Sequence, residues 1–152
     1  MALQRIHEHW REVHFEAHLN AIARKPFAWG EHDCCLFAAD AIQSFTGVDI
    51  AADFRGKYTD RLSAFQAIQA ITGGTTVADA AGWCAAKHGL LELQRPLCAQ
   101  RGDLVVLKQS AAGAADQLIA GIVHLSGAHV VSVAESGAVR LPITNVVRAW
   151  RV

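Results

Sequence analysis

The sequence lacks an excess of charge of either sign, a long hydrophobic run and a pattern of paired cysteines. Its 14 Lys and Arg residues balance its 14 Asp and Glu residues, and no basic run provides the positive potential that binding of nucleic-acid phosphates requires. Its apolar runs are broken by Gly, His or Asp well before the roughly 18 residues that a membrane span needs. We therefore expect no nucleic-acid partner and no insertion into a membrane.

A secretion signal and a cysteine-based metal site are also missing. Arg5, Glu8 and Arg11 interrupt the opening segment, which excludes the apolar stretch of a signal peptide and predicts synthesis in the cytoplasm. The four cysteines include no Cys-x-x-Cys pair, so they form neither a disulfide framework nor a zinc ligand set. His14 and His18 lie one helical turn apart, but no third ligand stands in a recognised spacing. No metal and no other cofactor are predicted.

What the sequence does contain is enough apolar material for a single domain over residues 1–152. Hydrophobic residues make up 52% of it and charged residues only 18%, unlike a disordered protein. Apolar residues three and four positions apart predict a first helix that ends near Arg24, before Pro26. Its apolar face consists of Leu3, Ile6, Trp10, Val13 and Ala17. Further helices, each preceded by a capping side chain and followed by glycine, are predicted over residues 33–47, 60–74 and 76–89.

From about residue 90 the pattern changes to short β-branched runs separated by turn residues. Strands are predicted over residues 104–107, 118–125, 129–134, 138–141 and 146–150. Ser126-Gly127 and Ser136-Gly137 are tight-turn signals, so consecutive strands are expected to pair as an antiparallel meander. The small residues of 110–115 predict a loop. The fold class is therefore α+β, with N-terminal helices packed on a C-terminal antiparallel sheet.

The segment from Phe27 to Asp40 is the most informative for chemistry. Asp33 is suited to cap the second helix, which places Cys34 and Cys35 in its first turn. Unpaired amide hydrogens and the positive end of the helix dipole favour a thiolate there, as a nucleophilic cysteine requires. The alternative is that one cysteine of the pair only packs as a small apolar residue.

This segment resembles the active-site segment of the NlpC-type cell-wall hydrolases, which are papain-like cysteine peptidases. The matching residues are Trp29-Gly30 and Asp33-Cys34. Later in the chain, Arg101–Leu107 resembles that family's Gly-Asp-Leu-Val strand, and Gly121-Ile122-Val123 resembles the strand that follows it. The resemblance covers most of the chain and implies a papain-like α+β fold.

Other details resemble one branch of these hydrolases more closely. The spacing between Trp29 and Cys34 is short, Cys35 stands where the family has Ser or Thr, and the chain closes with Val146–Val152. These features resemble an uncharacterised branch found among phage and prophage tail genes. The resemblance therefore implies a protein of a phage tail.

The resemblance also implies a set of site residues. Cys34 would be the nucleophile, and Trp29, Gly30, Asp33 and Cys35 would border the substrate cleft. We expect Cys34 rather than Cys35 to present its thiol to the cleft, because Cys35 lies about 100° further around the helix and its side chain should turn toward the core.

The catalytic base is the point at which this sequence departs from the family. The family's histidine stands two residues before the Gly-Ile pair, and this position is Ile119 here. His124 and His129 are the possible substitutes on strands, and His32 precedes the thiol by two residues. We favour His129, because His124 is five residues from Ile119 and an undistorted strand would point it to the opposite face. The alternative is that these histidines are only partly exposed strand residues.

Two functions fit these observations. The first is a bacteriophage tail-tip component with an NlpC-type fold, a degenerate active site and other tail-tip or hub subunits as partners. The second is an active cysteine endopeptidase of the tail that cleaves peptidoglycan cross-bridges, with Cys34 as nucleophile. The missing histidine favours the structural role. Both place the protein in the phage virion.

Overall fold

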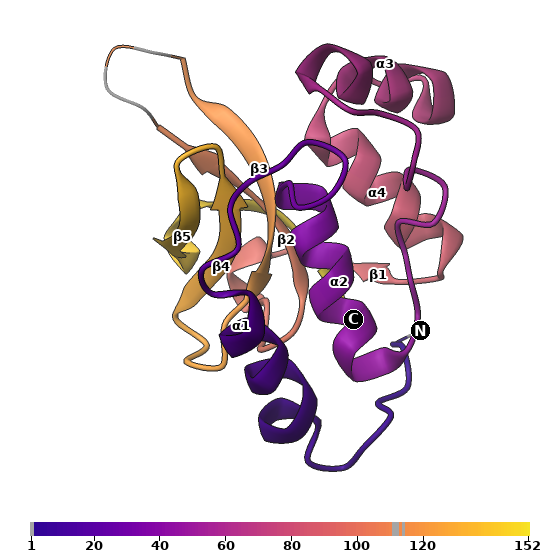
Figure 1. The fold of residues 1–152 in the computed structure, drawn as a ribbon. Helices are drawn as coiled ribbons and strands as arrows, with labels where there is room; N and C mark the ends of the chain where they lie inside the picture. The colour runs from indigo at the N-terminus through magenta and orange to yellow at the C-terminus, as the bar shows by residue number, and fades with distance from the viewer. Residues whose placement is uncertain (1, 111–112, 114) are drawn as a thin grey trace.

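A computed structural model describes residues 2–110, 113 and 115–152 of the chain. The first part of the chain forms helices, and the second part forms strands (Figure 1). The helices are η1 (Arg11–Glu16), α1 (Ala17–Ile22), α2 (Cys34–Thr46), α3 (Arg61–Thr72) and α4 (Val77–Lys87), with short 3-10 turns η2 (Pro96–Cys98) and η3 (Ile143–Asn145). The strands are β1 (Leu91–Glu92), β2 (Leu104–Gln109), β3 (Gln117–Val123), β4 (His129–Ala134), β5 (Gly137–Pro142) and β6 (Val146–Arg151).

The starts of α2, α3 and α4 follow from their capping side chains. The Asp33 carboxylate accepts a hydrogen bond from the Leu36 amide at 3.0 Å, which satisfies an amide that the helix itself leaves unpaired. Asp60 and Thr76 begin the next two helices with reciprocal capping boxes. These helices confirm the predictions over residues 33–47, 60–74 and 76–89.

The first predicted helix is wrong in its start and in its buried face. Residues 3–9 are not helical, and Ile6 and Val13 are 52% and 49% exposed. The helical segment opens instead with the π-helical turn η1, in which residues five positions apart align. Of the predicted face only Trp10 is buried, and Phe15, which lies outside that face, is the other buried side chain. Their ring centroids lie 4.6 and 5.3 Å from that of Phe45 of α2. The aromatic contact with α2 overrides the three-and-four spacing.

Over the described residues the strands form one antiparallel sheet in the order β1-β6-β2-β3-β4-β5. The predicted strands and the meander from β2 to β5 are confirmed. The last strand, β6, returns to pair with β2, and the two-residue strand β1 adds an edge that the sequence did not predict. In the β2–β3 pair, Leu107 lies opposite Ile119.

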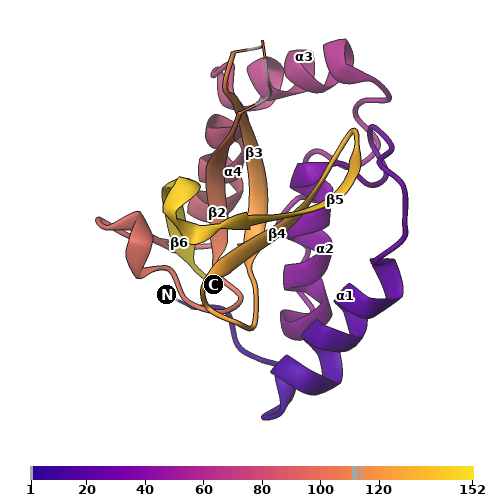
Figure 2. The same ribbon diagram turned by 90° about the vertical axis from the view of Figure 1, so that its left-hand side faces the viewer.

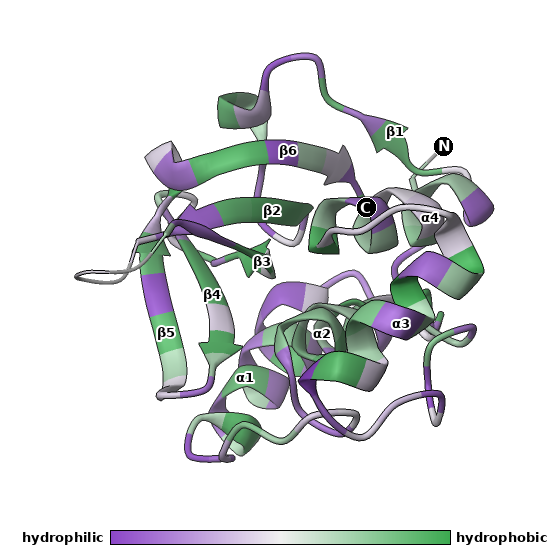
Figure 3. Cartoon of the chain, turned by 90° about the horizontal axis from the view of Figure 1, so that it is seen from above, coloured by the Kyte–Doolittle hydropathy of each residue, from purple (hydrophilic) through white to green (hydrophobic). Residues whose placement is uncertain are grey.

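The sheet curves around the helices, as the views in Figures 2 and 3 show. Leu104 and Val106 of β2 belong to the core shared with the helices, whereas Val105 and Leu107 belong to a second hydrophobic cluster. All of these side chains are 2% exposed or less, so both faces of β2 are covered. The α+β class, with helices packed on an antiparallel sheet, is confirmed.

Several other features of the chain bear on the sequence predictions. The predicted loop over residues 110–115 includes positions 111, 112 and 114, which lie outside the described residues. None of the helices in the described part of the chain is long and apolar enough to cross a membrane.

The two ends of the chain lie close together, and Arg5 donates a hydrogen bond to the Val152 carbonyl at 2.8 Å (Figures 1 and 2).

Candidate active site at the start of α2

The first turn of α2 holds the two adjacent thiols, and the backbone before it fixes that turn. The Asp33 carboxylate accepts hydrogen bonds from the amides of Gly30 and Leu36, each at 3.0 Å. Gly30 has φ +79°, and a Cβ there would lie 2.3 Å from the Tyr58 carbonyl oxygen. Only glycine tolerates this backbone conformation at such close range. Gly30 therefore positions Asp33, and it is not among the described residues that border the cavity described next.

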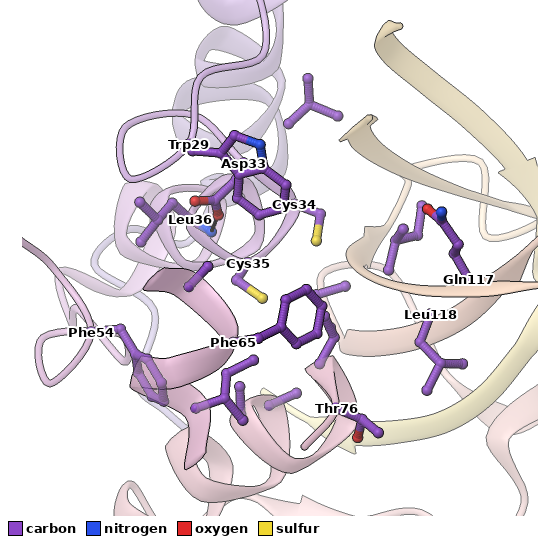
Figure 4. A pocket seen from close by; sticks show the side chains of 18 of the residues that line it. Trp29, Asp33, Cys34, Cys35, Leu36, Phe54, Phe65, Thr76, Gln117 and Leu118 are labelled. Carbon is purple, nitrogen blue, oxygen red and sulfur yellow. Dashed lines mark hydrogen bonds between the residues drawn. The ribbon is translucent and has the colours of Figure 1, made fainter. Parts of the chain in front are cut away.

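A cavity of about 520 Å³ opens beside the thiols between the helices and the sheet. Trp29, Asp33, Cys34 and Cys35, four of the site residues proposed from the sequence, all line it. In Figure 4 the sulfur atoms of Cys34 and Cys35 both point into this space, and Gln117 and Leu118 of β3 lie across from them. The resemblance to the hydrolases thus identified residues that share one cavity.

Neighbouring donors favour the thiolate form of Cys34. The hydrogen bond from the Cys35 thiol is the main cause that lowers the pKa of Cys34, and the Ala120 backbone on β3 adds to this effect. Burial and the negative charge of Asp33 oppose it, but the net pKa of Cys34 remains lowered. The arrangement places a thiol with a lowered pKa at a helix N-terminus, where a thiolate is favoured.

The structure corrects the expectation that Cys35 turns away from the cleft. Both thiols are half-buried and both line the cavity. Their roles nevertheless differ, because the hydrogen bond to Cys34 and burial raise the pKa of Cys35 well above its usual value. Cys35 therefore acts as the proton donor of the pair, and Cys34 remains the candidate nucleophile.

His124 and His129, the histidines predicted as bases, lie at one end of the β3–β4 hairpin, and the cavity that contains the thiols meets the other end. The cavity meets β3 at residues 117–120 and the β4–β5 turn at residues 133–136. His124 lies beyond the end of β3, where its amide donates a hydrogen bond to the His129 carbonyl at 2.8 Å. At about 3.3 Å per residue, this pair is about 16 Å along the strand from Ile119. Neither histidine is among the described residues that line the cavity.

The side-chain contacts of these two histidines are with the hairpin itself. His124 Nδ1 accepts a hydrogen bond from the Ser126 amide at 3.1 Å, and His129 Nδ1 lies 3.4 Å from both Ser126 Oγ and Arg140 Nη2. Burial and the nearby Arg140 lower the pKa of His124. The preference for His129 as the base finds no support in this geometry. The alternative of a partly exposed strand residue describes His129, whereas His124 is partly exposed just beyond the end of β3.

His32, the remaining substitute, is buried on another side of the helix start. Its side chain is 1% exposed, and its ring centroid lies 5.7 Å from that of Phe37. Burial, and to a smaller extent the charge of Lys25, lower its pKa. His32 does not line the cavity in the part of the chain that the structure describes. It is therefore a core residue that accompanies the motif rather than a partner of Cys34.

The position at which the resembled family has its base lies on the wall of the same cavity as the thiol. Ile119 lines the same cavity as Cys34, and both pack against the same hydrophobic cluster of the sheet. Ile119 is 6% exposed and carries no group that accepts a proton. Position 119 on β3 therefore borders the same cavity as Cys34, and an isoleucine occupies it.

Tyr58 is a site residue that sequence reasoning missed. Its hydroxyl donates a hydrogen bond to Asp33 at 2.6 Å, and its side chain lines the cavity. It lies in a segment without helical or strand periodicity, so no spacing connects it to Asp33. The available signal was that it is the sole tyrosine of the sequence and follows the turn residue Gly56.

Among the residues that the structure describes, those that could bind a metal do not gather at this site. No group of three or more His, Cys, Asp or Glu side chains in the described ranges could hold a metal ion. His14 and His18 likewise belong to no such group there.

The family model described as "Domain of unknown function (DUF6950)" matches residues 5–152. The chain belongs to the DUF6950 family. Comparison with curated proteins and with solved structures gave no match. The matched region of this DUF6950 chain includes both walls of the cavity, from Trp29 before α2 to Ile119 on β3.

Proposed function

We propose that this DUF6950 chain is a structural component of a bacteriophage tail tip with an NlpC-type papain-like fold and an incomplete active site. Its partners in this proposal are other tail-tip or hub subunits, and its location is the virion. The proposal combines the sequence resemblance to tail-associated NlpC-type proteins with the geometry around Cys34.

The observation that carries the proposal is the pairing of Cys34 with Ile119 across one cavity. In the family that the sequence resembles, a histidine at this place takes the thiol proton and returns it to the leaving amine. A thiolate without that general acid loses a factor of about 10²–10⁴ in rate. A scaffold that keeps the cavity and replaces the base with a buried isoleucine is suited to a non-catalytic role.

The first test restores the missing base. We expect the unmodified protein to release no fragments from purified peptidoglycan, whereas Ile119→His gains hydrolysis that Cys34→Ser in the same chain abolishes. Circular dichroism confirms that each variant is folded. A folded Ile119→His variant without activity would count against the NlpC-type assignment of the cavity.

The second test concerns location. Immunogold labelling of virions from the phage or prophage that encodes this chain should place it at the tail tip. Cys34→Ser should leave tail assembly and infectivity unchanged, because the thiol performs no essential reaction in this proposal. Absence of the chain from purified tails would overturn the tail-tip role.

The lowered pKa of Cys34 favours a second candidate, an active cysteine endopeptidase of the tail that cleaves peptidoglycan cross-bridges. It predicts that the unmodified protein digests purified peptidoglycan and that Cys34→Ser does not. It also predicts that a Cys34→Ser phage assembles normal tails but loses infectivity. These outcomes are the opposite of those expected for the structural role.

A further inference from the structure

Beyond the thiols, the larger part of the cavity lining is apolar. The apolar side chains come from the segment before α3, from α3 and α4, and from β3: Phe54, Phe65, Ile68, Val77, Ala80 and Leu118. Figure 4 shows Phe65 at the centre of this region, between Cys35 and the strands. An apolar concavity of about 520 Å³ that is open to solvent is typical of a site for a small ligand.

The polar groups of the lining restrict the ligand further. The Asp33 carboxylate is already occupied by the Gly30 and Leu36 amides and by Tyr58, so it offers little to a bound molecule. Asp116 accepts a hydrogen bond from Ser110 at 2.6 Å, and Glu135 is exposed in the β4–β5 turn. Asp116 and Glu135 occupy the sheet side of the cavity.

Arg61 provides the cation on the helix side. It lines the cavity at the start of α3, and its guanidinium carbon lies 5.3 Å from the ring centroid of Phe65. It forms no ion pair with a carboxylate in the described part of the chain. An exposed arginine beside an apolar cavity suits an anionic head group with an apolar tail.

We propose that this cavity binds a single-chain fatty acid of medium length. Its hydrocarbon chain lies among the apolar side chains of α3, α4 and β3, and its carboxylate faces Arg61 and points away from Asp116 and Glu135. A peptide suits the deep part of the cavity poorly, because its backbone groups would lose water without gaining hydrogen bonds. This binding activity is independent of the tail-tip role.

Chain length provides a test that needs no variant. Each methylene that enters the apolar part should tighten binding about four-fold, from the free energy of burying one CH₂ group. Isothermal titration of the full chain with octanoate, decanoate and dodecanoate should therefore give saturable one-to-one binding that strengthens along the series until the cavity is full. Equal affinities, or no saturable binding of any of them, would overturn the proposal.

Substitutions then test where the hydrocarbon tail and the carboxylate of the fatty acid lie. Ala80→Leu fills the cavity and should weaken decanoate binding more than ten-fold, whereas Ala86→Leu, exposed on the same helix, should not. Arg61→Gln should weaken decanoate about two- to five-fold, as for an exposed ion pair, and leave 1-decanol unchanged. Arg24→Gln, an exposed arginine away from the cavity, is the charge-matched control. Decanoate binding that is insensitive to both Ala80→Leu and Arg61→Gln would place the ligand elsewhere and contradict the proposal.

Discussion

The Tyr58 hydroxyl donates a hydrogen bond to Oδ2 of Asp33 across 2.6 Å, and this contact ties the segment before α3 to the N-terminus of α2. Both side chains are buried, at 8% and 2% exposure. Burial and the negative charge of Asp33 raise the pKa of Tyr58, so the phenol keeps its proton and remains a donor. The wall of the cavity is thereby fixed to the helix turn that carries both thiols.

Tyr58→Phe should destabilise the protein by about 1–3 kcal/mol, because a buried carboxylate loses one of its donors while the ring is retained. Urea denaturation monitored by circular dichroism measures this change. Ser44→Ala, which removes a hydroxyl bonded locally within α2, is the matched control and should cost less. Equal stability of Tyr58→Phe and the unmodified protein would show that the contact contributes nothing net.

Cys35→Ala should shift the alkylation of Cys34 to higher pH. The Cys35 thiol is the main cause of the lowered pKa of Cys34, so its removal leaves burial and Asp33 to raise that pKa. Cys35→Ser keeps a donor and should shift the profile less. Iodoacetamide rates measured by mass spectrometry from pH 5 to pH 10 provide the profile.

The other two cysteines, Cys84 and Cys98, are controlled for in this measurement. Cys98 is exposed and is replaced by serine in every variant, whereas burial raises the pKa of Cys84 to about 12. Cys84→Ala should therefore leave the Cys34 profile unchanged. A Cys34 profile that does not move in Cys35→Ala would refute the donor role of Cys35.

The parts of the fold that follow local rules could be predicted from the sequence. Asp33, Asp60 and Thr76 cap helices through contacts within three residues, so the local sequence determines where each helix begins. The β-branched runs and the glycine turns similarly encode β2 to β5. The buried face of the first helix was predicted wrongly except at Trp10, because Phe15 is buried against Phe45, which lies 30 residues further along the sequence.

The candidate site could be predicted only where its residues lie close together in the sequence. Trp29, Asp33 and Cys34 lie within one short motif, and the cavity contains all of them. Tyr58 joins them through tertiary contact alone, and strand parity could not show how far His129 lies along the hairpin. The orientation of Cys35 depends on a cavity between α2, α3 and β3 that no local pattern encodes.

Stability should fall as the solution is acidified below neutral pH, in part through His32. Its pKa in the folded protein is lowered by burial first and then by Lys25, with Asp40, Asp33 and His18 also facing it. Below an ordinary histidine pKa of about 6.5, the unfolded chain therefore binds a proton that the folded chain resists. The stabilisation is complete above pH 6.5 and is lost as the pH falls toward the folded pKa.

His32→Phe should flatten this pH dependence, because it removes the titrating group and keeps a ring beside Phe37. Urea unfolding of both proteins at pH 5, 6, 7 and 8 measures the slope. His9→Gln, at an exposed position, should not change it. His18, whose pKa burial also lowers, leaves a smaller residual slope. An unchanged slope in a folded His32→Phe variant would contradict the assignment.

Asp103→Ala should destabilise the protein by about 2–4 kcal/mol, because two backbone amides and one arginine lose the same buried carboxylate. The Asp103 carboxylate, 1% exposed, accepts hydrogen bonds from the amides of Gln100 at 2.8 Å and Val152 at 3.1 Å, and Arg151 lies 3.1 Å from it. It thus joins the turn before β2 to the residues that follow β6. Asp103→Asn keeps one acceptor oxygen and should cost less than Asp103→Ala. Arg151→Gln, which removes only the half-exposed cation, should cost least, and urea denaturation of the three variants checks this order. A loss in Arg151→Gln as large as that in Asp103→Ala would show that the ion pair, rather than the two amides, accounts for the contribution of Asp103.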